Sequence, residues 1–103
     1  MPLQIDPTAR GFRLEGELDL ATSQDLLVAI AERPSTDALT LDFSGVSFMD
    51  SSGLRALLEV ARARDGDAVV ILDPTPQVRR VLDISLPDGA PGLQVRGGDR
   101  GAS

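Results

Sequence analysis

The order of apolar and polar positions along the chain predicts short strands that alternate with helices. Two N-terminal stretches, residues 2–6 and 11–18, read as strands separated by turn-forming residues, so they predict a hairpin. Gly16 interrupts the alternation of the second strand, which indicates a bulge. Three further strands are predicted at residues 39–43, 68–72 and 93–95.

A helix is predicted directly after the second strand, because apolar residues there recur at helical spacing. These residues are Leu26, Leu27, Ile30 and Ala31. We interpret Thr22 as the N-cap, with Asp25 three residues later as a short version of the capping box. Pro34, followed by Ser35, is expected to end the helix.

Two further helices are predicted in the second half of the chain. The helix that begins at Ser52 has the clearest apolar stripe, formed by Leu54, Leu57, Leu58 and Ala61. Residues 65–67 are expected to stop it. Thr75 as a cap and Pro76 as the first helical residue predict a third, shorter helix that finishes near Ser85.

This order of elements predicts a small α/β domain with a mostly parallel sheet and an N-terminal hairpin. The alternation of apolar and polar residues at 39–43 predicts that the helices lie mainly on one face of the sheet. We expect residues 1–96 to form the domain and residues 97–103 to be a flexible tail. Loops that follow parallel strands gather at one edge, so Asp19 and the segment 50–52 are expected on a common rim.

Composition excludes several classes of function. The chain of 103 residues contains no cysteine and no histidine, so a Ser-His-Asp triad is impossible and neither a metal nor another cofactor is expected. The formal net charge is −6 and no basic cluster interleaved with aromatic residues is present, so direct nucleic-acid binding is not favoured. No membrane-spanning or signal-peptide pattern is found, and we expect a soluble cytoplasmic protein.

The polar residues between the third strand and the second helix allow several interpretations. Taken alone, Ser51 is most simply an N-cap, and Asp19 is a solvated turn residue or a helix cap. Gly53 would let another chain approach near the serine. Asp19 and Asp50 on one rim would also fit a metal or an acid–base pair, although no third ligand is evident. Nucleotide hydrolysis is not favoured, because no glycine-rich loop ending in Gly-Lys-Ser/Thr is present.

The two polar turns together resemble a known family. Gly16-Glu17-Leu18-Asp19 followed by a helix, and then Phe48-Met49-Asp50-Ser51-Ser52-Gly53-Leu54, resemble the STAS domain of bacterial anti-sigma factor antagonists over about residues 3–85. The resemblance implies a binding module that is not an enzyme. It implies that Ser51 is phosphorylated by a partner that is both anti-sigma factor and serine protein kinase, and that a metal-dependent serine phosphatase reverses this modification. The positions implied at or near the partner-binding rim are Asp19, Asp50, Ser51, Ser52, Gly53 and Leu54.

The same resemblance leaves one alternative within binding modules. A STAS domain can be a constitutive scaffold or a transporter accessory, in which case Ser51 is never modified. Members of the family usually finish with a further helix after the last strand, whereas a glycine- and proline-rich segment follows here. Contacts that depend on such a helix are therefore not expected, and the oligomeric state stays open.

Overall fold

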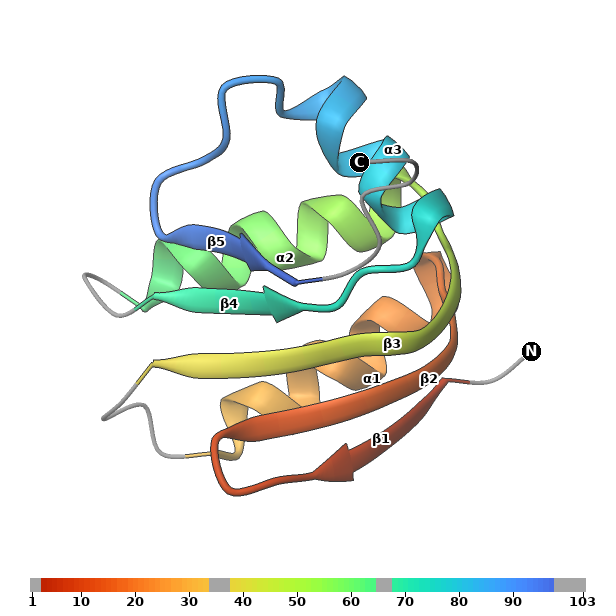
Figure 1. The fold of residues 1–103 in the computed structure, drawn as a ribbon. Coiled ribbons are helices and arrows are strands. Elements are labelled where there is room, and N and C mark those ends of the chain that lie inside the picture. Colours follow the sequence, from red (N-terminus) through yellow and green to blue (C-terminus); the bar gives the residue numbers. More distant parts are fainter. Residues whose placement is uncertain (1–2, 34–37, 65–67, 98–103) are drawn as a thin grey trace.

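The computed structural model describes residues 3–33, 38–64 and 68–97 (Figure 1). In chain order its elements are β1 (Gln4–Pro7), β2 (Gly11–Leu18), α1 (Leu20–Ala31), β3 (Leu39–Met49), α2 (Ser51–Ala63), β4 (Val69–Leu72), α3 (Pro76–Ser85) and β5 (Leu93–Arg96). The strands form one sheet in the order β1-β2-β3-β4-β5. β1 and β2 pair antiparallel as the predicted hairpin, and the other neighbours are parallel. The predicted α/β class and mostly parallel sheet are confirmed.

The strand β3 is much longer than its apolar pattern indicates. It continues beyond the predicted end at Phe43 as far as Met49, although Ser44, Ser47 and Phe48 are exposed. The extension is stabilised by β2, which pairs along it until Leu18 lies opposite Met49. Gly16 has a φ of 121° and lies beside a shift in the β2–β3 register, which confirms the predicted irregularity.

Several predicted boundaries fall on residues that the structure does not describe. They are Pro2 in the first strand, Pro34 and Ser35 after the first helix, residues 65–67 after the second, and all of the predicted tail except Gly97. Within the described part, the second and third helices end close to their predicted positions.

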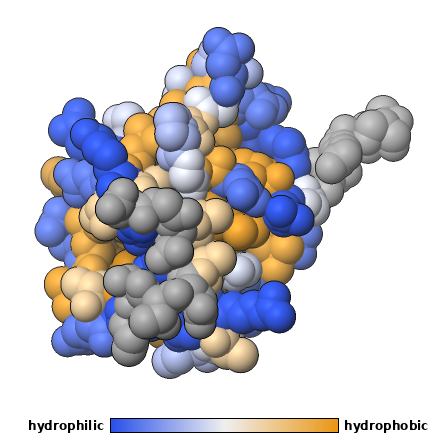
Figure 2. All heavy atoms as spheres, turned by 90° about the vertical axis from the view of Figure 1, so that its left-hand side faces the viewer, coloured by the Kyte–Doolittle hydropathy of each residue, from blue (hydrophilic) through white to orange (hydrophobic). Residues whose placement is uncertain are grey.

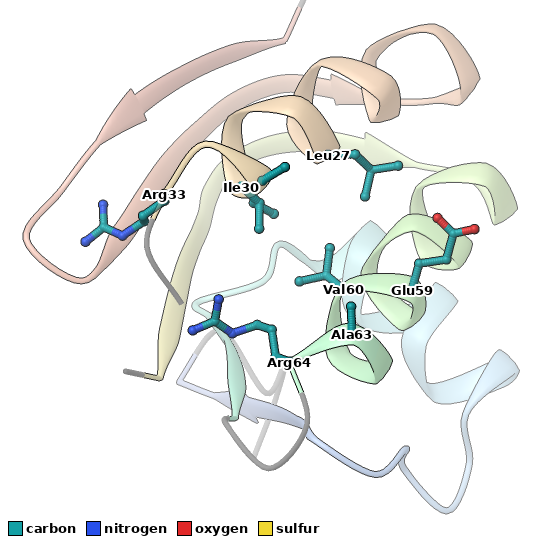
Figure 3. Close-up of a pocket in the computed structure, with 8 residues that line it drawn as sticks. Leu27, Ile30, Arg33, Glu59, Val60, Ala63 and Arg64 are labelled. Atoms are coloured by element: carbon teal, nitrogen blue, oxygen red, sulfur yellow. The ribbon is translucent and has the colours of Figure 1, made fainter. Parts of the chain in front are cut away.

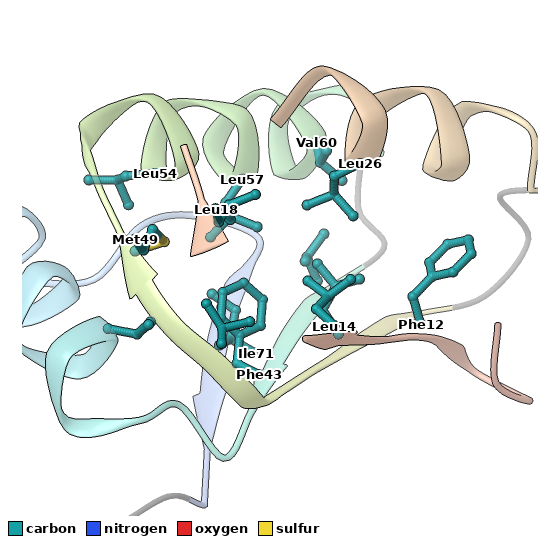
Figure 4. Close-up of a cluster of buried hydrophobic side chains, with 14 of the residues drawn as sticks. Phe12, Leu14, Leu18, Leu26, Phe43, Met49, Leu54, Leu57, Val60 and Ile71 are labelled. Atoms are coloured by element: carbon teal, nitrogen blue, oxygen red, sulfur yellow. The ribbon is translucent and has the colours of Figure 1, made fainter. Parts of the chain in front are cut away.

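The helices α1 and α2 cover the same face of the sheet, as the alternation in β3 predicts (Figure 1). Figure 4 shows side chains from both helices and from the strands meeting between these two layers. The largest completely buried side chains there are Phe43, Leu14, Leu18, Leu26, Leu39, Leu41, Met49, Leu57 and Ile71. The opposite face of the sheet carries polar residues such as Arg13 and Asp42, whose side chains approach to 3.9 Å. The core lies on one side of the sheet. The turns that follow the strands lie at the edge of this core, where polar residues can reach the surface.

The helix α3 takes the place of a strand beside the end of β3. β4 pairs with β3 only as far as Asp42, so Met49 has no strand partner on that side. The Met49 N–H donates to Gln77 Oε1 at 2.9 Å, and Gln77 Nε2 donates to the Met49 carbonyl at 3.2 Å. Thr75 occupies the N-cap position, but its hydroxyl donates to the Val46 carbonyl at 2.7 Å and makes no cap hydrogen bond. Thr75 and Gln77, at the beginning of α3, thus hydrogen-bond the backbone of β3 at Val46 and at Met49, next to Asp50.

Replacing Gln77 with methionine is expected to destabilise the domain and loosen the end of β3. The change keeps the side-chain length but removes both hydrogen bonds to the buried Met49 backbone, at a cost of about 1 to 3 kcal/mol. Urea unfolding measures the loss, and hydrogen exchange at the Met49 amide should become faster. Gln24→Met on the exposed side of α1 is the matched control. Unchanged exchange at Met49 would show that Gln77 does not hold this strand end.

Candidate functional site

The two polar turns lie side by side where β2 and β3 end. Leu18 is opposite Met49 in the parallel pair, and the Asp50 N–H donates to the Leu18 carbonyl at 3.3 Å. Asp19 and Asp50 therefore follow on neighbouring strands and begin α1 and α2. The predicted common rim is confirmed; below, "the switch rim" means Asp19, Asp50, Ser51 and Ser52.

Asp19, and not Thr22, is the N-cap of α1. The Asp19 carboxylate accepts from the Thr22 N–H at 3.0 Å, while the Thr22 hydroxyl accepts from the Asp19 N–H at 2.9 Å. The predicted cap is thus wrong by three residues: Thr22 is the second half of the capping box and not its first. The backbone hydrogen bond from Thr22 is the main cause that lowers the pKa of Asp19 from its ordinary value, so this carboxylate is charged at neutral pH.

Asp50 is the N-cap of α2, so the interpretation of Ser51 as the cap is also wrong. Asp50 Oδ1 accepts from the N–H groups of Ser52 at 2.9 Å and Gly53 at 3.1 Å, and the Asp50 carbonyl accepts from Leu54 N–H at 3.1 Å. Both carboxylates of the switch rim therefore accept hydrogen bonds from backbone N–H groups in the first turn of a helix. Among the described residues no cluster of three His, Cys, Asp or Glu side chains could hold a metal ion.

Ser51 is the first residue of α2, and its side chain is exposed. Its hydroxyl makes no hydrogen bond to any residue in the described part of the chain, whereas the Asp50 side chain beside it makes two. Ser52, the next residue, is half-buried. Ser51 thus combines a helical backbone position with a hydroxyl that no hydrogen bond within the described residues uses.

Gly53 and Leu54 lie on the buried side of α2, which faces the sheet. A Cβ on Gly53 would lie 2.8 Å from both Leu18 Cγ and the Leu18 carbonyl oxygen, and 2.9 Å from Met49 Cγ. The interpretation that Gly53 leaves room for another chain is therefore wrong, because the protein's own strands occupy that space. Leu54 is 7% exposed, and Figure 4 shows it directed from α2 toward the sheet near Met49. These two residues seat the first turn of α2 on the ends of β2 and β3.

Gly53→Ala is expected to destabilise the fold by about 1 to 3 kcal/mol, the usual cost of inserting a methyl group into a packed site. The clash involves the Leu18 backbone oxygen, which cannot move without disturbing β2. Thermal or urea unfolding measures the effect, with Ser52→Ala in the same helical turn as the control. A Gly53→Ala variant as stable as wild type would mean that the helix is not seated as closely as the structure indicates.

A groove between α1 and α2 opens next to the switch rim. It has a volume of about 240 Å³ and is lined by Leu20, Ser23, Gln24, Leu27, Ser52, Arg55, Ala56 and Glu59. Leu20 directly follows Asp19 and is 68% exposed. Sequence reasoning missed Leu20 and Arg55 as candidate site residues. The sequence does contain a feature that could have identified them: both residues have long side chains and lie outside the apolar stripes of their helices.

A second hollow, of about 350 Å³, lies toward the other ends of α1 and α2 and is not our candidate site. Figure 3 shows Arg33 at its margin, directed toward the β1–β2 hairpin. The Arg33 guanidinium donates to the carbonyls of Thr8, Ala9 and Gly11 at 2.8–3.2 Å and lies 5.6 Å from the centre of the Phe12 ring. Arg33 therefore ties the hairpin to α1. Figure 2 views the molecule from the side on which this hairpin turns and shows apolar and polar residues interspersed there.

Comparisons with known proteins identify the family of this chain. A family model described as Mlab, STAS domain, matches residues 1–93. The chain is 35% identical over 78 residues to an anti-sigma F factor antagonist from Paenibacillus polymyxa, and the match covers 71% of this chain and 67% of the relative. No helix in the part of the chain that the structure describes is long and apolar enough to cross a membrane.

Solved structures show the same fold. The anti-sigma factor antagonist SpoIIAA in its unphosphorylated form superposes with a TM-score of 0.68 at 28% identity, covering 92% of this chain and 88% of that one. A segment of the murine anion transporter Slc26a9 superposes with a TM-score of 0.58 at 21% identity, covering 89% of this chain and 17% of the transporter, which is a likeness of fold alone. On the family match and the shared fold, this chain belongs to the STAS domain family.

Proposed function

We propose that this protein is an anti-sigma factor antagonist whose binding is switched by phosphorylation of Ser51. The observation that carries the proposal is the exposed, unused hydroxyl of Ser51 on the first turn of α2, next to Asp50 and beside Asp19. The likeness to the Paenibacillus antagonist and to SpoIIAA supports the antagonist role. In its unmodified form the protein binds the anti-sigma factor and so releases a sigma factor.

The chemistry of the switch follows from where the charge is added. A phosphate brings about −1.5 to −2 charges at neutral pH. The beginning of α2 tolerates an anion, because the helix dipole contributes about 0.3 to 1 kcal/mol in its favour. The seating of that turn depends on Gly53 and Leu54 on the inward side, away from the modified hydroxyl. Phosphorylation therefore changes the surface of the switch rim and leaves the packing beneath it unchanged.

The partners that fit this role act in a cycle. The anti-sigma factor is also the serine protein kinase that modifies Ser51, and a metal-dependent serine phosphatase regenerates the binding form. Asp19, Asp50, Ser51 and Ser52 form the contact surface, and Gly53 and Leu54 contribute by holding its shape. The protein itself supplies no catalysis, and the cycle takes place in the cytoplasm.

A pull-down from native lysate tests the antagonist role. The unmodified chain is expected to capture a protein that also binds a sigma factor, and adding an excess of this chain should release that sigma factor in a competition experiment. Gly53→Ala is unsuitable as the negative control because it is expected to disturb folding, so Ser51→Asp, which adds a rim charge at a hydroxyl that caps nothing, is preferred. Capture of a partner that shows no affinity for any sigma factor would argue against the proposal.

The second candidate is a constitutive STAS scaffold or transporter accessory. The fold likeness to a segment of an anion transporter is the observation that keeps it open. In that role Ser51 would carry no phosphate under any growth condition, and partner binding would not depend on ATP. Phosphate found on Ser51 in protein purified from its own cells would exclude this candidate.

A further inference from the structure

We propose that Arg55 is the intramolecular counter-ion of the phosphate on Ser51, an inference that rests on the proposed phosphorylation of this residue. Arg55 lies four residues after Ser51 on α2, and both side chains are exposed. Residues at i and i+4 face the same side of a helix, with Cβ atoms about 5 to 6 Å apart. Side chains on a helix also lean toward its N-terminus, which directs the guanidinium of Arg55 toward Ser51.

The backbone at the start of α2 is already committed. The N–H groups of Ser52 and Gly53 donate to the Asp50 carboxylate, and that of Leu54 donates to the Asp50 carbonyl. A phosphate on Ser51 cannot use these three donors without displacing the cap. A nearby cationic side chain is therefore the best source of charge-assisted hydrogen bonds to the phosphate.

The carboxylates around Ser51 oppose part of the negative charge that a phosphate brings. Asp50 precedes Ser51, Asp19 lies beside Asp50 on the next strand end, and Glu59 lines the same groove as Arg55. The groove residues that α1 contributes, Leu20, Ser23, Gln24 and Leu27, carry no charge. Like charges favour the protonated form of a phosphate, so the two aspartates nearest to Ser51 raise its second pKa toward neutral pH. Without a cation nearby, part of the phosphate would carry only one negative charge.

Arg55 is the cation that lines the groove next to the switch rim. Its guanidinium forms no hydrogen bond or ion pair with another residue in the described ranges, so no existing contact must break. Guanidinium groups bind phosphate through two parallel N–H donors, which suits a partner one helical turn away. Arg55 thus keeps the phosphate doubly charged and holds it against α2.

The test is a ³¹P NMR titration of the full chain with phosphoserine installed at position 51 by nonsense suppression. Removing the charge with Arg55→Gln is expected to raise the second pKa of the phosphate by roughly 0.5 to 1 pH unit, the effect of one exposed charge at contact distance. Arg62→Gln removes the same charge roughly 16 Å farther along α2 than Ser51, beyond the Debye length, and should leave the pKa unchanged. Arg55→Lys should retain most of the wild-type value.

The outcomes separate this inference from the proposed function. A pKa that is the same in wild type and Arg55→Gln overturns the role of Arg55, and so does an equal rise in Arg55→Gln and Arg62→Gln. If Arg55→Gln does not fold, an Arg55→Lys pKa that differs from the wild-type value by about 1 pH unit overturns it as well, because lysine keeps the charge. Because the phosphate is installed without the kinase, absence of phosphate on Ser51 in cells would remove the proposed function and leave this titration unaffected.

Discussion

Phosphoserine at position 51 is expected to weaken binding of the anti-sigma factor by about 100- to 1000-fold while the domain keeps its stability. The fold change corresponds to about 2.7 to 4 kcal/mol, the usual cost of a like-charge contact or an unpaired charge at a protein interface. The site favours such a selective effect, because the Ser51 side chain is exposed and its hydroxyl has no hydrogen-bond partner among the described residues. Calorimetry of modified and unmodified chains measures the binding change.

Three controls separate charge from structure in this experiment. Ser51→Ala should bind like wild type and unfold within about 0.5 kcal/mol of it, since the hydroxyl caps nothing. Ser51→Asp should lose affinity in the same direction as phosphoserine. Phosphoserine at Ser44, an exposed position about 20 Å back along β3, should leave binding intact. Equal affinity of the modified and unmodified chains would reject an electrostatic switch at this turn.

Asp50→Ala is expected to lower both the stability of the domain and the rate of Ser51 phosphorylation, because it removes the cap on which the geometry of Ser51 depends. The N–H groups of Ser52 and Gly53 would lose their acceptor, at a cost of about 1 to 2 kcal/mol of unfolding free energy. The first turn of α2 would fray, and phosphorylation of Ser51 would slow even though the serine itself is unchanged. Urea unfolding and the initial rate of phosphate transfer measure the two effects.

Asp50→Asn distinguishes the cap from the charge. Asparagine caps helices about as well as aspartate, so this variant should regain most of the lost stability. Any remaining defect in partner binding would then belong to the carboxylate charge at the switch rim. If Asp50→Ala is as stable as wild type, the hydrogen bonds from Ser52 and Gly53 do not hold this turn.

Most of the architecture could be predicted from the periodicity of apolar residues. The hairpin, the parallel strands and the one-sided cover of the sheet all follow from local patterns. The second half of β3 could not, since its exposed Ser44, Ser47 and Phe48 look like a loop. Its strand structure comes from partners distant in sequence, namely β2 on one side and the side chain of Gln77 on the other. The pattern of apolar residues within one segment does not indicate contacts with residues that are distant in sequence.

For the site, sequence analysis correctly predicted that the two polar turns lie together. It assigned the helix-capping role to the wrong residues. Aspartate, serine and threonine all cap helices, so choosing Thr22 over Asp19, or Ser51 over Asp50, requires backbone geometry. Likewise, the glycine at position 53 could have faced a partner or the protein's own core, and only the packed position of α2 decides for the core. The grouping of the rim is confirmed, and the binding role of its residues stays a proposal.

The most direct test of the central claim is to map the phosphate after incubation of the full chain with its anti-sigma partner and ATP. Intact-mass measurement and peptide sequencing should find one added phosphate, located on Ser51. Ser51→Ala should accept none, although its fold and its partner binding persist. Modification confined to Ser44, Ser47 or Ser52, or none at all by a partner that is bound and active on other substrates, would contradict the account.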